Sequence, residues 1–117
     1  MQDHIFRMYD IRGIVGKDLL LEDVVQIATA FSFHLFKKDP ESDIIIVAMD
    51  GRTHSPDIKE AFVNALQHCG HTVFFIGICP TPILVFALYC MNIGAGCMIT
   101  ASHNPKEYNG FKLFSEK

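Results

Sequence analysis

Residues 44–49, IIIVAM, form an unbroken apolar run that stops at the polar sequence Asp50-Gly51-Arg52. Six consecutive apolar residues followed by a polar loop are typical of a strand covered on both faces, as in a parallel sheet. Such a strand needs helices packed on both sides of its sheet. This run therefore constrains the fold more than any other feature of the chain.

One helix is predicted before this strand in the sequence and another after it. Residues 22–38 repeat apolar side chains at helical spacing, with acidic residues in the first turn and lysines in the last, as the helix dipole favours. After the strand, Ser55-Pro56 supplies an N-cap and an N1 proline, and Gly70 suits the C′ position after the helix. The order helix, strand, helix is typical of α/β proteins.

The remaining segments continue this alternation. A strand is expected over 5–11 and is broken by Arg12-Gly13. Further strands are expected at 72–76, 95–99 and 111–114. A helix is expected at 81–90, with Ile83, Phe86, Ala87 and Cys90 facing inward. Together they predict one domain over 1–117, a three-layer α/β/α sandwich around a mixed, mostly parallel sheet.

Composition excludes several classes of function. A net charge of −3 predicts no nucleic-acid partner. No apolar run approaches the roughly 20 residues that span a membrane, and no secretory signal is visible, so no membrane partner is expected. The four cysteines form no CxxC pair and the histidines lack metal-ligand spacing. Buried reduced thiols, a cytoplasmic protein and no zinc site are therefore predicted.

Ligands of parallel sheets bind beyond the carboxyl ends of the strands. The loops expected there are 50–53, 77–80 and 100–109, joined by 9–12 if the first strand points the same way. The sequence TASHNPKEYNGFK at residues 100–112 places a hydroxyl, an imidazole and an amine in and beside one of these loops. This loop is the candidate reactive site.

Ser102 could take part in two kinds of chemistry. A serine hydrolase with a strand-turn-helix elbow would show GxSxG, which is absent, and adjacent side chains such as His103 point away from one another in extended chain. A phosphate-handling serine fits better: phosphoserine carries about −1.5 to −2 charge and favours nearby cations, here Arg12, His103 and Lys112. From spacing alone, a structural loop turned by Asn104-Pro105 remains the alternative.

Four segments carry a resemblance to a known family. They are FRMYDIRGIVG (6–16), AMDGRTHSP (48–56), GICPTP (77–82) and TASHNPKEYNGFK (100–112). In this order they resemble the N-terminal domain, domain I, of the α-D-phosphohexomutases, specifically the phosphomannomutase/phosphoglucomutase branch. The resemblance covers essentially the whole chain, and the serine, histidine, Asn-Pro and NGFK of the last segment match the family's catalytic loop.

The resemblance implies a mechanism. Ser102 would carry a phosphoryl group that passes to a phosphosugar substrate, giving a bisphosphate sugar and interconverting hexose 6-phosphate and hexose 1-phosphate, such as mannose or glucose phosphates. Arg12 and Lys112 would be the surrounding cations and proton-transfer candidates. His103 would assist the proton shuttle, and Tyr9 would line the substrate cleft.

The resemblance also implies roles around the serine. Mg²⁺ would bind a phosphoryl oxygen on Ser102. Asp50 and Arg52 are interpreted as architecture that supports the catalytic loop, and Asn104 as a residue that shapes it.

The family's other parts are expected to lie outside this sequence. Its domains II–IV, including the aspartate loop of DGDxDR type that shares the Mg²⁺, have no counterpart in residues 1–117. An isolated domain I would have negligible mutase activity and could self-associate through uncovered edges. The alternative is a free-standing binding module that keeps the domain I fold without turnover. The identity of the hexose is not encoded here.

Overall fold

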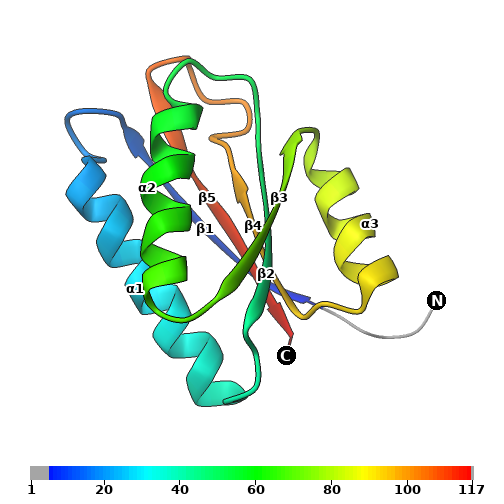
Figure 1. The fold of residues 1–117 in the computed structure, drawn as a ribbon. Coiled ribbons are helices and arrows are strands. Elements are labelled where there is room, and N and C mark those ends of the chain that lie inside the picture. The colour runs from blue at the N-terminus through cyan, green and yellow to red at the C-terminus, as the bar shows by residue number, and fades with distance from the viewer. Residues whose placement is uncertain (1–5, 117) are drawn as a thin grey trace.

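Five strands form one sheet in the order β1-β5-β4-β2-β3, in a computed structural model that describes residues 6–116 (Figure 1). In chain order the elements are β1 (Phe6–Ile14), α1 (Leu21–Lys38), β2 (Ile44–Met49), α2 (Ser55–His68), β3 (Thr72–Ile78), α3 (Thr81–Met91), β4 (Ala95–Ile99) and β5 (Tyr108–Glu116). Strands and helices alternate as far as β4, as the sequence predicts.

β5 runs against both of its neighbours. It pairs antiparallel with β1 and with β4, whereas β2 pairs in parallel with β3 and β4. β1, β2, β3 and β4 therefore point the same way, which confirms the mixed, mostly parallel sheet. Because β1 shares this direction, its carboxyl end lies at the same edge of the sheet as the loops after β2 and β4.

The helices cover the sheet on both faces, with α1 and α2 on one side and α3 on the other (Figure 1). The larger core lies under α1 and α2, where Phe62 and Phe111 stack with ring centroids 4.9 Å apart. On the opposite face, Leu84 and Leu88 of α3 are fully buried in a cluster with Ile46. Burial stabilises the fold by about 1.5–3 kcal/mol for each large apolar side chain. The predicted three layers are confirmed.

The ends of α1 and α2 follow the sequence signals with one exception. At the start of α1 the Asp23 carboxylate accepts the N–H of Leu20 at 2.8 Å. After α2, Gly70 has a φ of 104°, which confirms its C′ role. The predicted N-cap at Ser55 is wrong, because His54 occupies that position and makes no side-chain cap. The Ser55 side chain is buried and bonds to Asp50 instead.

The inward face predicted for α3 is right for Ala87, which packs against the core, and wrong for Ile83, Phe86 and Cys90. Phe86 is 65% exposed and Ile83 49% exposed, whereas Leu84 and Leu88 are buried. α3 is apolar on nearly every side, so its sequence contains no stripe that marks one face. Although apolar, α3 is short, and no helix within residues 6–116 is long and apolar enough to cross a membrane.

Three strands extend beyond their predicted ranges, among them β5, which covers Tyr108–Glu116 instead of 111–114. Arg12 and Gly13 do not end β1, because they pair with Gly110 and Asn109 of β5. β3 continues to Ile78 through a segment that the sequence indicates as a loop. β3 lies at the edge of the sheet, and Ile78 is 66% exposed there. The free edge of β3 accounts for its exposed apolar side chains.

The four cysteines are all free thiols. Cys97 of β4 is fully buried, and this burial raises the pKa of its thiol well above the ordinary value. Cys69 and Cys79 are half-buried and Cys90 is exposed. The prediction of buried thiols is therefore right for Cys97 and wrong for Cys90, which lies on the outer side of α3.

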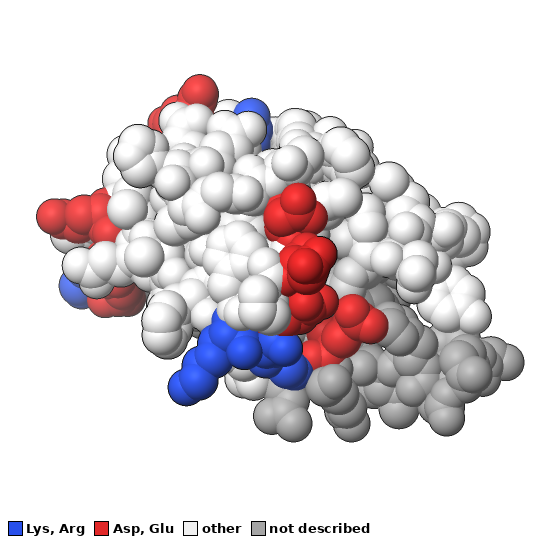
Figure 2. Space-filling view, turned by 60° about the horizontal axis from the view of Figure 1, so that its bottom comes forward, with Lys and Arg blue, Asp and Glu red and all other residues white. Residues whose placement is uncertain are grey.

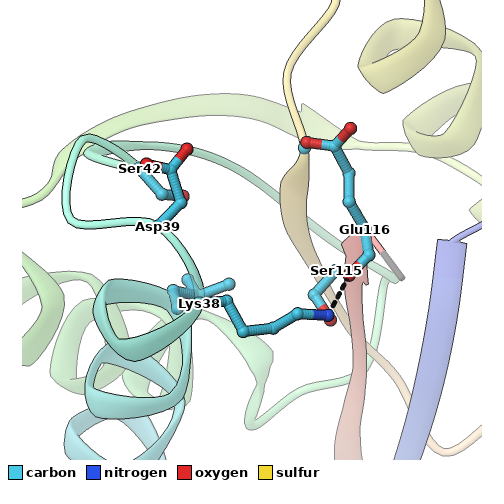
Figure 3. A pocket seen from close by; sticks show the side chains of 7 residues that line it. Lys38, Asp39, Ser42, Ser115 and Glu116 are labelled. Atoms are coloured by element: carbon cyan, nitrogen blue, oxygen red, sulfur yellow. Dashed lines mark hydrogen bonds between the residues drawn. The ribbon is translucent and has the colours of Figure 1, made fainter.

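The end of the sheet opposite the candidate loop carries four acidic side chains, those of Asp39, Glu41, Asp43 and Glu116. Figure 2 shows acidic side chains gathered there beside a group of basic ones. Close by, Lys38 at the end of α1 donates to the backbone carbonyl of Glu116 and so fastens α1 to β5 (Figure 3). A pocket of about 220 Å³ opens between them, with Asp39 and Ser42 on its other side.

Candidate functional site

The loop after β4 meets the loop after β2 at the carboxyl edge of the sheet. The backbone continues the sheet for a short distance beyond the strands, since Asp50 N–H donates to Ile99 at 3.0 Å and Thr100 N–H donates to Gly110 at 2.9 Å. Both loops therefore start from fixed positions. The candidate residues are placed by strands, as expected for a site on a rigid scaffold.

Asp50, directly after β2, is the centre of a hydrogen-bond network. Its carboxylate accepts the hydroxyl of Thr100 at 2.7 Å and that of Ser55 at 3.0 Å, together with the backbone N–H and the Nε–H of Arg52. Burial alone would raise the pKa of Asp50, but these hydrogen bonds outweigh burial and lower it. The carboxylate is therefore ionised at neutral pH.

Arg52 uses all five of its N–H donors within the protein. Nε donates to Asp50, and the two terminal nitrogens donate to backbone carbonyls of the β4–β5 segment at 2.8–3.1 Å, namely those of Ser102, Asn104, Pro105 and Tyr108. One side chain thus fixes four carbonyls from Ser102 to Tyr108. The prediction that Asp50 and Arg52 support this loop is confirmed.

Ser102 has a left-handed backbone conformation, with φ of 58°. Its N–H donates to the Thr100 hydroxyl oxygen at 2.9 Å, and its carbonyl accepts from Arg52 at 2.8 Å. Left-handed residues other than glycine are uncommon and cost of order 1–3 kcal/mol. Contacts on both sides of Ser102 stabilise this conformation, and backbone outliers of this kind concentrate at functional sites.

Arg12 approaches the same loop from β1. Its Nη1 donates to the side-chain oxygen of Asn104 at 2.6 Å, while Nε and Nη2 bind the carboxylate of Asp10 at 2.9 and 2.8 Å. The Arg12 hydrogen bonds lower the pKa of Asp10, and Asp10 in turn raises that of Arg12. Three of the five donors are used within the described residues, so Arg12 keeps N–H groups for a ligand.

Lys112 lies on the same face of the sheet as Arg12. It is directly opposite Asp10 in the β1–β5 pair, and its charge contributes to the lowered pKa of Asp10. Its amine makes no hydrogen bond to another residue within 6–116. Arg12 and Lys112 therefore place two cations beside the loop that contains Ser102.

Two of the predicted site residues, His103 and Tyr9, lie outside the hydrogen-bond network around Ser102. His103 is exposed next to Ser102, without a hydrogen bond to any described residue. Tyr9 pairs with Leu113, whose side chain belongs to the core under α1 and α2, and its ring meets His34 edge-on at 6.0 Å. Tyr9 is therefore on the face opposite Lys112. Its role in substrate binding stays a prediction, and the structure does not bring it to Arg12.

The end of the loop contains residues whose roles the sequence did not reveal. Ser55 accepts from Asn109 Nδ2 at 3.0 Å, and Asn109 Oδ1 accepts the N–H of Gly110 at 2.9 Å. Gly110 lies so close to β1 that a Cβ would come within 2.0 Å of the Ile11 carbonyl oxygen. Asn-Gly between two apolar segments was the only local signal, and it indicated a turn rather than a contact with β1.

The described residues do not fit a complete magnesium site. An open depression of about 370 Å³ adjoins the loop and is lined by Asp50, Gly51, Arg52, Asn104 and Lys106. Asp50 is its single carboxylate and is already occupied by its hydrogen bonds. No group of three or more His, Cys, Asp or Glu side chains suited to a metal occurs within residues 6–116.

Comparison with known proteins gives a consistent result. A sequence model described as "Phosphoglucomutase/phosphomannomutase, alpha/beta/alpha domain I" matches residues 3–117. A phosphomannomutase/phosphoglucomutase from Pseudomonas aeruginosa is 40% identical over 110 residues, which are 93% of this chain and 23% of that protein. A phosphoglucomutase/phosphomannomutase from Thermococcus kodakarensis is 36% identical over 109 residues, which are 93% of this chain and 24% of that protein.

The fold agrees with these sequence matches. The crystal structure of a phosphoglucomutase/phosphomannomutase family protein from Burkholderia thailandensis matches with a TM-score of 0.81 and 34% identity, over 92% of this chain and 25% of that one. The chain thus spans about a quarter of the length of the curated relatives it matches. With almost its full length covered by the family's domain I, this chain belongs to the phosphoglucomutase/phosphomannomutase family.

Proposed function

We propose that this chain is the phosphoryl-carrying domain of a phosphohexomutase and that Ser102 is the carrier. The observation that supports this most directly is the backbone of Ser102, which is held in a left-handed conformation between Thr100 and Arg52. Backbone outliers of this kind concentrate at functional sites. The family membership supplies the reaction class.

The proposed transfer exchanges one O–P bond for another. A hydroxyl oxygen of a hexose monophosphate bonds to the phosphorus on Ser102 while the bond from Ser102 Oγ to phosphorus breaks. The proton of the sugar hydroxyl is taken up by a neighbouring base and ends on Ser102 Oγ. The resulting hexose bisphosphate reorients and returns its other phosphoryl group to Ser102 in the same steps reversed, so the hexose phosphate is isomerised.

The cations around the serine fit this transfer. The spare N–H donors of Arg12 suit phosphate oxygens, which arginine binds in a bidentate manner. Lys112 contributes a second positive charge and, with the exposed His103, is a candidate for the proton transfer. Arg52 is excluded as a phosphate ligand because its donors are all engaged by Asp50 and the loop.

The proposal includes an Mg²⁺ ion that the phosphoryl group on Ser102 would share with carboxylates outside residues 6–116. When bound, it would neutralise charge on the phosphoryl group of Ser102. A hard cation of this kind needs several oxygen ligands. Its carboxylates would have to come from outside the described residues, which provide no such group.

The carrier assignment is tested by intact-mass spectrometry. We expect the purified chain, incubated for many hours with a hexose 1,6-bisphosphate, to gain about 80 Da, the mass of one phosphoryl group, because one slow transfer per molecule is detectable by mass even where catalytic turnover is negligible. The gain should be absent in Ser102→Ala and unchanged in Ser42→Ala, a half-buried serine at the opposite end of the sheet. A gain that persists in Ser102→Ala would place the phosphoryl group on another residue.

A further inference from the structure

We propose that Thr100 and Arg52 are positioning residues that hold Ser102 in its left-handed conformation and so aim its hydroxyl for phosphoryl transfer. Arg52 is interpreted from the sequence only as general support for the loop, and Thr100 has no role assigned from the sequence. The inference rests on the proposed function of Ser102, since positioning matters only if Ser102 reacts. The support comes from the direction of each hydrogen bond around the serine.

The direction of the Thr100 bond is fixed by Asp50. An ionised carboxylate only accepts hydrogen bonds, so the single hydroxyl proton of Thr100 must point to Asp50, at 2.7 Å. The lone pairs of the same oxygen are then left to accept the N–H of Ser102, at 2.9 Å. A threonine hydroxyl that was free to rotate could instead act as a donor near Ser102. Asp50 therefore determines which role the Thr100 hydroxyl plays.

The other side of the Ser102 peptide is fixed by Arg52. Nη2 of Arg52 binds the carbonyls of both Ser102 and Asn104, at 2.8 and 3.0 Å, and Asp50 orients the guanidinium through Nε. The planar guanidinium imposes a fixed angle between these bonds. Ser102 is thus held at its N–H by Thr100 and at its carbonyl by Arg52, and both holders are bound to Asp50.

This double attachment offsets the cost of the left-handed backbone. A strained residue persists only where its surroundings over-determine it, and relaxing Ser102 would break the bonds at both of its peptide groups together. Thr100 is buried and Arg52 mostly so, with 14% of its side chain exposed, which strengthens their bonds relative to exposed ones. The proposal therefore predicts local effects at Ser102 when either residue loses its hydrogen-bonding pattern.

Amide hydrogen exchange of the ¹⁵N-labelled chain tests the positioning directly. Thr100→Val removes the hydroxyl at nearly constant shape, and Thr100→Ser restores it. We expect the Ser102 amide to exchange at least about tenfold faster in Thr100→Val, equivalent to about 1.4 kcal/mol, and to stay within about twofold of wild type in Thr100→Ser. Arg52→Lys should also accelerate exchange, since lysine has three donors and no planar fork. Thr72→Val, on exposed β3, is the matched control and should have no effect.

Backbone chemical shifts and phosphorylation complete the test. The shifts should indicate positive φ at Ser102 in wild type and Thr100→Ser and lose that signature in Thr100→Val. The rate of phosphoserine formation from hexose 1,6-bisphosphate should fall at least about tenfold in Thr100→Val and recover in Thr100→Ser. A purely structural role of Thr100 would instead accelerate exchange equally throughout β2 and β4.

The possible outcomes separate this proposal from the proposed function. Unchanged exchange and φ at Ser102 in both Thr100→Val and Arg52→Lys would overturn the positioning role. So would failure of Thr100→Ser to restore wild-type behaviour. If exchange responds as expected but phosphorylation persists in Ser102→Ala, the backbone attachment stands and the assignment of Ser102 as carrier is wrong.

Discussion

At the scale of single residues, Asp50 connects both ends of the candidate loop. It accepts hydroxyl protons from Thr100, which binds the Ser102 amide, and from Ser55, which receives the Asn109 side chain. Because both hydroxyls donate to one carboxylate, the orientation of the whole network follows from a single negative charge. This explains why a loop of small polar residues adopts one conformation.

The buried residue His71 is expected to make the stability of the fold depend on pH. His71 is 4% exposed, stacks on Phe36, and pairs through Nε2 with the Ser32 hydroxyl at 2.7 Å. Burial lowers the pKa of His71 despite a backbone hydrogen bond that acts in the other direction. A histidine whose pKa is lowered by folding contributes stability above its unfolded pKa of about 6.5, and the contribution is lost as the pH falls below that value.

We therefore expect the free energy of unfolding to fall between about pH 7 and pH 5.5, where few carboxylates titrate. Urea denaturation across this range measures the change. His71→Gln should remove the slope, whereas His68→Gln, which alters an exposed histidine of α2, should retain it. A slope that survives in His71→Gln would assign the dependence to another group.

Some features of the candidate site can be predicted from the sequence and others cannot. Asp50 and Arg52 could be assigned to the loop because they directly follow a strand at the carboxyl edge of the sheet. The positive φ of Ser102 and the contacts of Ser55 could not, because both depend on residues about 50 positions away along the chain. Ser-Pro is a local signal that predicts an N-cap at Ser55, but the Ser55 hydroxyl instead bonds to Asp50 and accepts the distant Asn109 side chain.

At the scale of elements, the predicted bounds are accurate where the sequence has a clear pattern of apolar residues between polar loops. β2 and β4 match the predicted ranges, because buried strands between polar loops are well marked in sequence. β1, β3 and β5 extend further than predicted, since strand pairing, rather than local preference, determines where they end. α3 was placed correctly but rotated wrongly, because a helix that is apolar all round does not specify its buried side.

The orientation of α3 is tested by a pair of substitutions two residues apart. Leu88 is fully buried against β2 and β4, while Phe86 is 65% exposed. Leu88→Ala should cost about 2–5 kcal/mol of stability through the cavity it leaves. Phe86→Ala should change stability by less than about 0.5 kcal/mol, as measured by urea denaturation. Equal losses would mean that α3 buries the face indicated by its sequence.

At the scale of the whole molecule, the proposed phosphoryl-carrier loop is not enclosed by a cleft within residues 6–116. Arg12 is exposed, Lys112 is half-buried, and the depression beside the loop is open to solvent. Phosphoryl transfer depends on positioning the sugar and excluding water, and effective molarities in enclosed sites are worth about 7–11 kcal/mol. The described residues fix the position of Ser102 but do not enclose a sugar bound beside it.

We therefore expect residues 1–117 alone to have negligible mutase activity. Conversion of glucose 1-phosphate to glucose 6-phosphate is measured in a coupled assay, with the Pseudomonas aeruginosa phosphomannomutase/phosphoglucomutase as the positive control. The reason is loss of positioning rather than loss of fold, so the chain should remain folded by circular dichroism under the same conditions. A turnover rate near that of the control would refute the expectation.

The position of β5 between β1 and β4 has a consequence for how this domain forms. β1 has β5 as its sole neighbour in the described sheet, with Phe6 opposite Glu116, so the first and the fifth strands of this sheet in chain order pair with each other. Closing so long a stretch of chain is entropically costly and slows folding. During translation β1 therefore lacks its partner strand until β5 has left the ribosome, and we expect the contact of Arg12 with Asn104 to become stable only after β1 and β5 have paired.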